Sequence, residues 1–244
     1  EITAERTRQI IAACEKGGAK LACIFQNRFS EDFQKVYRAV QAGELGRLVL
    51  GNAYIKWFRS QEYYDSASWR GTKKGDGGAA LINQSIHTID LLLYVMGPVK
   101  AVSGMVKTLT HKIEGEDVGV GNIEFENGAL GTIEGSTSIF EGFPERLEIH
   151  GEEGSIILEG GKIIYWNTKS TGKLDFFKIE NQSARGSSDP MAISHRLHIK
   201  QLEAIIAAIK KGDTPPVSGE DAIKPIQVIE AVYRSSATGQ TVRL

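Results

Sequence analysis

The feature that most constrains the fold is the segment 75–98, GDGGAALINQSIHTIDLLLYVMGP, which begins with three glycines in four positions and then stays apolar up to a Gly-Pro pair. An apolar run of this length predicts a buried helix that ends at that pair. The run also contains Asn83, His87 and Asp90. A buried polar group without a partner costs about 1 to 3 kcal/mol. These three side chains therefore need partners or a function.

The spacing of these polar residues places them on one side of the predicted helix. With about 100° per residue, His87 lies about 40° from Asn83 and Asp90 about 20° in the other direction. Either this line faces a polar cleft, or Asp90 orients His87 in an internal network, and a satisfied core histidine is the structural alternative. Gly77 and Gly78 would admit a backbone or a ligand at the helix start, where free amides bind anions or carbonyls. Histidine titrates near neutrality and suits proton exchange with a hydroxyl.

Helices are predicted on both sides of a run of strands. Thr3 is expected to cap a helix that ends at Gly17-Gly18, followed by a short strand at 20–25. A second amphipathic helix covers 33–40, and two more close the chain at 192–211 and 219–236, the last one capped by Ser218. Residues 59–78 have no clean period and are expected to form a long functional loop.

The strands predict a largely antiparallel sheet. Asn127-Gly128 and Gly160-Gly161 separate strand-like segments and indicate hairpins, because both central residues of a type I′ turn need positive φ. We therefore expect an α+β fold, an open sheet with helices packed on one face. The other face would be solvated or would form a homo-oligomer interface. The segments expected to be strands are 48–58, 99–109, 118–126, 129–139, 145–151, 154–160, 162–166 and 173–180.

Composition excludes several classes of partner. The 244 residues carry 29 basic and 30 acidic side chains with no basic block, so neither a nucleic acid nor an anionic membrane surface is indicated. The longest apolar run is too polar to span a membrane, and the first residues do not resemble a secretory signal. With only two cysteines, we expect a cytoplasmic protein with reduced thiols. His195 and His198 are three residues apart, but without a third ligand they do not predict a metal site.

Several long motifs resemble the C-terminal portion of the glucose-fructose oxidoreductase, inositol dehydrogenase and MocA family. WRG at 69–71, the segment 75–97 and FQNRFSEDFQKVYRAVQAGELGRLVLG at 25–51 carry this resemblance, which covers nearly the whole chain. It extends through EDVGVGNIEFENGALGTIEGS at 116–136 and SGEDAIKPIQVIEAVYRSSATGQTV at 218–242. The resemblance implies an NAD- or NADP-dependent oxidoreductase of a sugar, polyol or nucleotide sugar.

The resemblance also implies roles for single residues. His87 matches the acid/base histidine that exchanges the proton of the substrate hydroxyl while hydride passes to the nicotinamide. Asn83 stands where many members have Asp, and an amide can hydrogen-bond a hydroxyl but cannot take its proton. Trp69 and Arg70 match the dipeptide that approaches the cofactor. The resemblance further implies that Arg28 and His198 contact substrate, although a salt bridge would explain Arg28 equally well.

No glycine-rich dinucleotide fingerprint follows a strand, and the family's EKP motif does not occur in the sequence. We therefore expect residues 1–27 to be the last helix and strand of a truncated dinucleotide-binding domain, and 28–244 to be a C-terminal substrate-binding and oligomerisation domain. The expected function is that of the substrate half of a sugar or polyol dehydrogenase, inactive alone. The alternative is a non-catalytic sugar-binding or oligomerisation module with the same fold.

Overall fold

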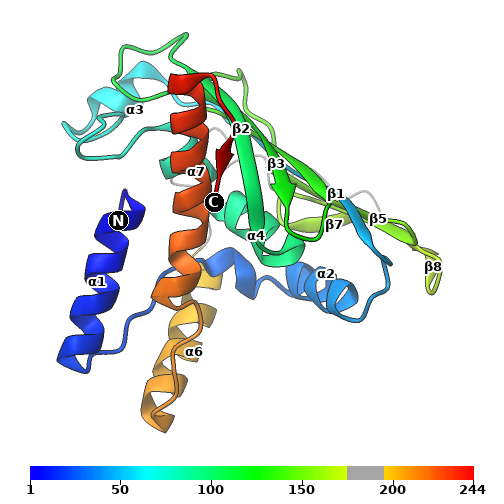
Figure 1. Cartoon of the computed structure of the whole chain (residues 1–244). Helices are drawn as coiled ribbons and strands as arrows, with labels where there is room; N and C mark the ends of the chain where they lie inside the picture. Colours follow the sequence, from blue (N-terminus) through cyan, green and yellow to red (C-terminus); the bar gives the residue numbers. More distant parts are fainter. Residues whose placement is uncertain (175–194) are drawn as a thin grey trace.

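The computed structural model describes residues 1–174 and 195–244, which form a mixed sheet of nine strands with helices on one side (Figure 1). The order of strands across the sheet is β8-β7-β6-β5-β1-β4-β3-β2-β9. The expected α+β architecture is thus confirmed. The strands are β1 (Leu48–Lys56), β2 (Val99–Lys107), β3 (Val118–Phe125), β4 (Leu130–Ser136), β5 (Arg146–Gly151), β6 (Gly154–Glu159), β7 (Lys162–Thr168), β8 (Gly172–Leu174) and β9 (Val242–Arg243).

The sheet is antiparallel except at its centre. β1 lies between β4 and β5, pairing parallel with β4 and antiparallel with β5. Parallel neighbours need a long crossover connection, and the helices between β1 and β2 together with the strands β2 and β3 provide it. This arrangement places the ends of β1 and β4 side by side, where the Arg59 amide, just after β1, donates to the Thr137 carbonyl, just after β4, at 2.8 Å.

Both predicted hairpins are present, with different turns. Gly160 and Gly161 have φ of 56° and 73°, as a type I′ turn between β6 and β7 requires. Between β3 and β4 only Gly128 has positive φ, at 85°, so this connection is not a type I′ turn. The Asn127 side chain helps to hold this connection. Its Nδ2 donates to the Met96 carbonyl, and its Oδ1 accepts from the Ala129 backbone amide.

The core lies between the sheet and two helices, α4 (Ile86–Met96) and α7 (Gly219–Thr238). α7 runs along β2, and α4 lies over β1 and β5 (Figure 1). Leu92, Ile133 and Ile229, from three of these elements, are almost completely buried. The remaining helices are α1 (Ala4–Gly17), α2 (Glu31–Gln41), α3 (Gln61–Asp65) and α6 (Arg196–Lys211), with a 3-10 turn η1 (Gln26–Phe29) and a π-helical turn η2 (Ala80–Ser85).

The helix caps follow the sequence closely. Thr3 accepts from the Arg6 amide at the start of α1, and Gly18 closes that helix in the left-handed region. Ser218 accepts from the Asp221 amide at the start of α7. The start of α6 is described only from Arg196, so the first residues of the helix expected at 192–211 lie outside the described residues. The same holds for residues 175–180 of the last expected strand.

Two expectations about local structure were wrong. No strand forms at 20–25, because this segment pairs with no strand in the part of the chain that the structure describes. There, the Cys23 amide donates to the carbonyl of the distant Val217. The central helix does not begin as an α-helix either, since η2 precedes α4. In addition, α3 occupies part of the long loop at 59–78.

The sheet face away from the helices carries exposed apolar side chains. A Cβ on Gly121 would meet Val232 of α7, so the neighbouring residues of β3 point to the opposite face. Val120 lies there, paired with Met105 of β2, and both are exposed, as is Leu130 of β4. Among the described residues, no helix has the length and apolar character that crossing a membrane would need.

Candidate functional site

The start of the central helix is held by a buried carboxylate. Glu116 accepts hydrogen bonds from the Leu81 amide at 2.8 Å, from the Ala79 amide at 3.3 Å and from the Tyr233 hydroxyl at 2.9 Å. Burial raises the pKa of Glu116. Gly78, with φ of 155°, leaves no room for a Cβ beside the Tyr233 hydroxyl. The amides at the helix start therefore face Glu116. Of the two glycines expected to admit a backbone or a ligand, Gly77 lies against Ile2 and Gly78 lies against the backbone of Gly115.

The π-helical turn changes the direction of the polar side chains. A π-helix bonds i to i+5 rather than i to i+4, so the 100° step does not apply through Asn83. Asn83, His87 and Asp90 consequently enter three different environments. Asp90 binds Arg28, and among the described residues no hydrogen bond joins it to His87. The internal network in which Asp90 orients His87 is therefore wrong.

Asn83 belongs to a ring of hydrogen bonds that includes the predicted cofactor contact. Its Nδ2 donates to Asp76 Oδ1, and its Oδ1 accepts from Gln84 Nε2. Gln84 Nε2 also donates to the Tyr63 hydroxyl at 3.1 Å, and Arg70 donates to the same hydroxyl at 2.6 Å. Asp76 Oδ2 accepts from the amide of Gly71, the residue after Arg70, at 2.9 Å and so closes the ring.

The predicted cofactor contacts lie side by side at the edge of a hollow. The Arg70 guanidinium carbon is 4.6 Å from the centroid of the Trp69 ring and 4.2 Å from that of Tyr63. Trp69 is exposed, and Arg70 lines a cavity of about 440 Å³. Arg70 Nε is buried and has no hydrogen-bond partner among the described residues. This pair thus combines an exposed aromatic face with a buried donor that has no partner among the described residues.

His87 is half-buried and packs edge-on against Phe25, with 5.7 Å between ring centroids. Burial lowers the pKa of His87 to about 4, and nearby His198 adds to the shift. Nδ1 of His87 and Nδ1 of His198 are both buried without a hydrogen-bond partner among the described residues. The imidazole is therefore neutral at pH 7 and can accept a proton.

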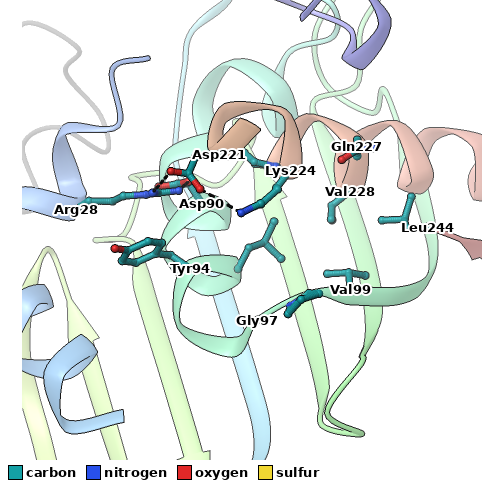
Figure 2. Close-up of a pocket in the computed structure, with 13 residues that line it drawn as sticks. Arg28, Asp90, Tyr94, Gly97, Val99, Asp221, Lys224, Gln227, Val228 and Leu244 are labelled. Atoms are coloured by element: carbon teal, nitrogen blue, oxygen red, sulfur yellow. Dashed lines mark hydrogen bonds and ion pairs between the residues drawn. The ribbon is translucent and has the colours of Figure 1, made fainter. Parts of the chain in front are cut away.

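Arg28 lies in a separate cavity, of about 410 Å³, between α4 and α7 (Figure 2). Its Nε and Nη2 bind the two oxygens of Asp90 at 2.8 and 2.6 Å, and Nη1 lies 3.5 Å from Asp221. The guanidinium also stacks on Tyr94, at 4.1 Å from the ring centroid. Burial raises the pKa of Asp90 to about 6, against the effect of Arg28. Arg28 thus has carboxylate partners within the protein itself.

The structure connects some of the predicted site residues and separates others. Asn83, Arg70 and the turn after Trp69 share one hydrogen-bonded ring, and His87 lies near His198 of α6. The sequence analysis did not identify Asp76. Its position between two glycines is a signal that could have drawn attention to it. Within residues 1–174 and 195–244, no cluster of three or more His, Cys, Asp or Glu could hold a metal ion.

The chain matches the model of a known protein family. A model described as the GFO/IDH/MocA C-terminal domain matches residues 33–157, which is more than half of the chain. The matched region extends from α2 to β6 and includes the ring around Asn83 as well as His87.

Similar proteins of known name are dehydrogenases. The chain is 27% identical to scyllo-inositol 2-dehydrogenase (NAD(+)) of Bacillus subtilis, with 98% of the chain and 65% of that protein covered. It is 26% identical to D-apiose dehydrogenase of Paraburkholderia graminis, covering 100% of the chain and 64% of the relative. The chain thus spans less than two thirds of the length of either relative.

Among solved structures, the chain is similar to the WlbA dehydrogenase from Bordetella pertussis in complex with NADH and UDP-GlcNAcA. The TM-score is 0.86 at 27% identity, with 100% of the chain and 69% of that structure covered.

Proposed function

We propose that this chain, which belongs to the GFO/IDH/MocA family, is the substrate-binding part of an NAD(P)-dependent oxidoreductase that acts on a hydroxyl of a sugar, polyol or nucleotide sugar. The observation that carries the proposal is the neutral imidazole of His87, whose buried Nδ1 lacks a partner among the described residues. It lies four residues after Asn83, whose side-chain amide is hydrogen-bonded to Asp76. The names of the inositol and apiose dehydrogenases support the same substrate class.

In this proposal His87 accepts the proton of the hydroxyl that is oxidised. A histidine must be neutral to act as a base, and burial, which lowers the pKa of His87 to about 4, keeps it neutral at pH 7. The same shift makes it a weaker base than an exposed histidine. Asn83 donates to, or accepts from, a neighbouring hydroxyl of the substrate, and His198 of α6 contributes a second imidazole close to His87. Arg28 acts mainly by holding Asp90, because its donors face Asp90 and Asp221.

Trp69 and Arg70 fit the role of cofactor contacts. Trp69 exposes an aromatic face, and the buried Nε of Arg70 lacks a partner among the described residues, so the pair suits a planar ring or an anionic group. NAD(P), when bound, supplies the hydride acceptor. The protein residues then orient the hydroxyl and take its proton.

A second domain in the same protein would complete the site. We propose that residues 1–27 belong to a dinucleotide-binding domain and residues 28–244 to the substrate domain. Supporting this, α6 exposes an apolar face that spacings of three and four residues place on one side of the helix. In Figure 1, α1 and α6 both extend away from the sheet. The exposed apolar residues of α6 are Ile199, Leu202, Ile206 and Ile209.

The free face of the sheet is the proposed homo-oligomer interface. Met105, Val120 and Leu130 are exposed there on three adjacent strands. A patch of this kind on one face of an open sheet favours association with a second copy of the chain.

The test uses the intact protein encoded by the source gene, with NADH or NADPH formation followed on a panel of inositols, aldoses and UDP-sugars. His87→Asn should remove most turnover while the dissociation constant for NAD(H) stays the same. His150→Asn is the matched control, because the His150 side chain contacts Ser155 and Glu148 and, among the described residues, none of those assigned to the site. If His87→Asn turns over its best substrate at the wild-type rate, the assignment of His87 as the base is wrong.

The second candidate is a non-catalytic sugar-binding or oligomerisation module. Asn83 favours it, because an amide cannot take the hydroxyl proton as a carboxylate can. Calorimetric titration of the 244-residue chain with the same sugars, without cofactor, separates the two. Tight binding combined with no turnover by the intact protein would support the module.

A further inference from the structure

Asp76 is a buried carboxylate that no expected role explains. It is 8% exposed, lies in the loop before η2, and uses both oxygens as acceptors. Oδ2 binds the Gly71 amide, which anchors the carboxylate to the protein backbone. Oδ1 binds the side-chain amide of Asn83. Burial raises the pKa of Asp76, yet both contacts need the ionised form as acceptor.

This contact decides which way the amide of Asn83 faces. A carboxylate can only accept, so Nδ2 of Asn83 must face Asp76 and Oδ1 must face Gln84, which donates to it. One hydrogen on Nδ2 and one lone pair on Oδ1 are left for a substrate. A hydrogen bond to a carboxylate also polarises the amide and makes Oδ1 a stronger acceptor for a hydroxyl proton.

We propose that Asp76 is the positioning residue for Asn83, fixing the amide so that Oδ1 accepts a hydrogen bond from a substrate hydroxyl. The negative charge that the family resemblance leads one to expect at position 83 is thus present one hydrogen bond away, at position 76. This inference rests on the proposed function for its consequence on turnover. The Asp76–Asn83 pair itself can be tested on the 244-residue chain without any substrate.

Exchange of the two residue types provides the sharpest test. In Asp76→Asn, the new amide oxygen can still accept from Gly71, but its NH2 group then faces the NH2 group of Asn83. The amide of Asn83 should therefore turn over and direct its Oδ1 to position 76. In Asn83→Asp, two carboxylates face each other, which costs stability at neutral pH. The double variant Asp76→Asn/Asn83→Asp restores an amide and a carboxylate in contact, in reversed positions.

The first arm measures thermal unfolding and NMR spectra of the chain. Each single variant should lower the unfolding midpoint, and the double variant should recover most of that loss. In wild-type protein the side-chain NH2 signals of Asn83 should shift with the ionisation of Asp76, and this shift should vanish in Asp76→Asn. Asp65→Asn, the same change at an exposed residue of α3, is the control and should alter neither measurement. Additive single and double effects would overturn the proposed pair.

The second arm measures kinetics of the intact protein with its best substrate from the panel. Asp76→Asn should lower kcat/KM at least tenfold with an unchanged dissociation constant for NADH, and the double variant should recover activity. An unchanged kcat/KM in Asp76→Asn would overturn the positioning role. If no panel compound is turned over by wild type, the proposed function fails, while the first arm still decides whether Asp76 sets the orientation of Asn83.

Discussion

His87 illustrates how burial changes the chemistry of one residue. Its pKa in the folded chain is about 4, against an ordinary value of 6.5. Between these values the unfolded chain binds a proton that the folded chain does not, so stability rises with pH across this window. The contribution of neutral His87 to the free energy of unfolding is fully present above pH 6.5 and is lost as the pH falls toward 4.

We therefore expect the free energy of unfolding to include a term from His87 that falls by up to about 3 kcal/mol between pH 7 and pH 4. Urea unfolding of wild type and His87→Gln over this range measures it. The difference between the two proteins should be constant above pH 7 and should change steadily below pH 6.5. A difference independent of pH would contradict the low pKa.

In the Arg28–Asp90 pair, the attraction between two buried charges offsets the cost of removing them from water. Both side chains are buried, and the pair is ionised at neutral pH, above the pKa of about 6 of Asp90. Removal of one partner leaves a buried charge, which typically costs about 3 to 5 kcal/mol. Asp90→Ala should lose stability of this order in urea unfolding at pH 7, reduced by the remaining contact with Asp221.

The exposed pair Arg47–Glu152 is the matched control, with its closest atoms 2.7 Å apart. Solvent screens exposed pairs, so Glu152→Gln should have little effect on the free energy of unfolding. Equal losses in the two variants would mean that Arg28 and Asp90 are solvated and not buried together.

At the scale of elements, the start of the central helix depends on Glu116. Its carboxylate accepts from two backbone amides of the helix start and from Tyr233 of α7. Glu116→Gln keeps the size of the side chain but turns an NH2 group toward these donors. We expect a loss of about 2 kcal/mol, the usual cost of leaving buried polar groups unpaired. Hydrogen exchange of the Leu81 amide should also become faster.

Glu114→Gln provides the control for this prediction, because the one hydrogen bond that Glu114 accepts among the described residues comes from the exposed Lys73 amide. If both variants unfold at the wild-type midpoint, the π-helical turn does not depend on the carboxylate.

The features of these elements that the sequence predicts depend on neighbouring residues, whereas those it does not predict depend on residues far apart in the chain. The caps by Thr3 and Ser218 and the glycine turns follow from local backbone preferences, and sequence patterns identified them. The π-helical turn at Ala80–Ser85 could not be predicted, because Glu116, 35 residues from Leu81, holds its amides. The contact of Asn83 with Asp76 depends on that turn.

At the scale of the whole molecule, the free face of the sheet predicts the state of association. Val120→Lys places a charge in the centre of the exposed apolar patch on β3. We expect this variant to sediment as a monomer at concentrations where wild type associates, with an unchanged unfolding midpoint of the monomer. Ile206→Lys on α6, which is also exposed, should leave association of the 244-residue chain unchanged. A wild-type chain that stays monomeric at all concentrations would contradict the proposed interface.

The sequence by itself determined the α+β class, most helix and strand segments and the type I′ turn at Gly160-Gly161, because period, caps and glycines act over a few residues. The strand predicted at 20–25 does not form, since a strand needs a neighbouring strand to pair with. Among residues 1–174 and 195–244, this segment makes a single long-range backbone bond, from Cys23 to Val217. Tertiary structure alone decided the parallel pairing of β1 with β4 and the partners of Asp90 and Asn83. These depend on groups far apart in the chain, whose meeting is set by packing of the whole core and not by any local pattern.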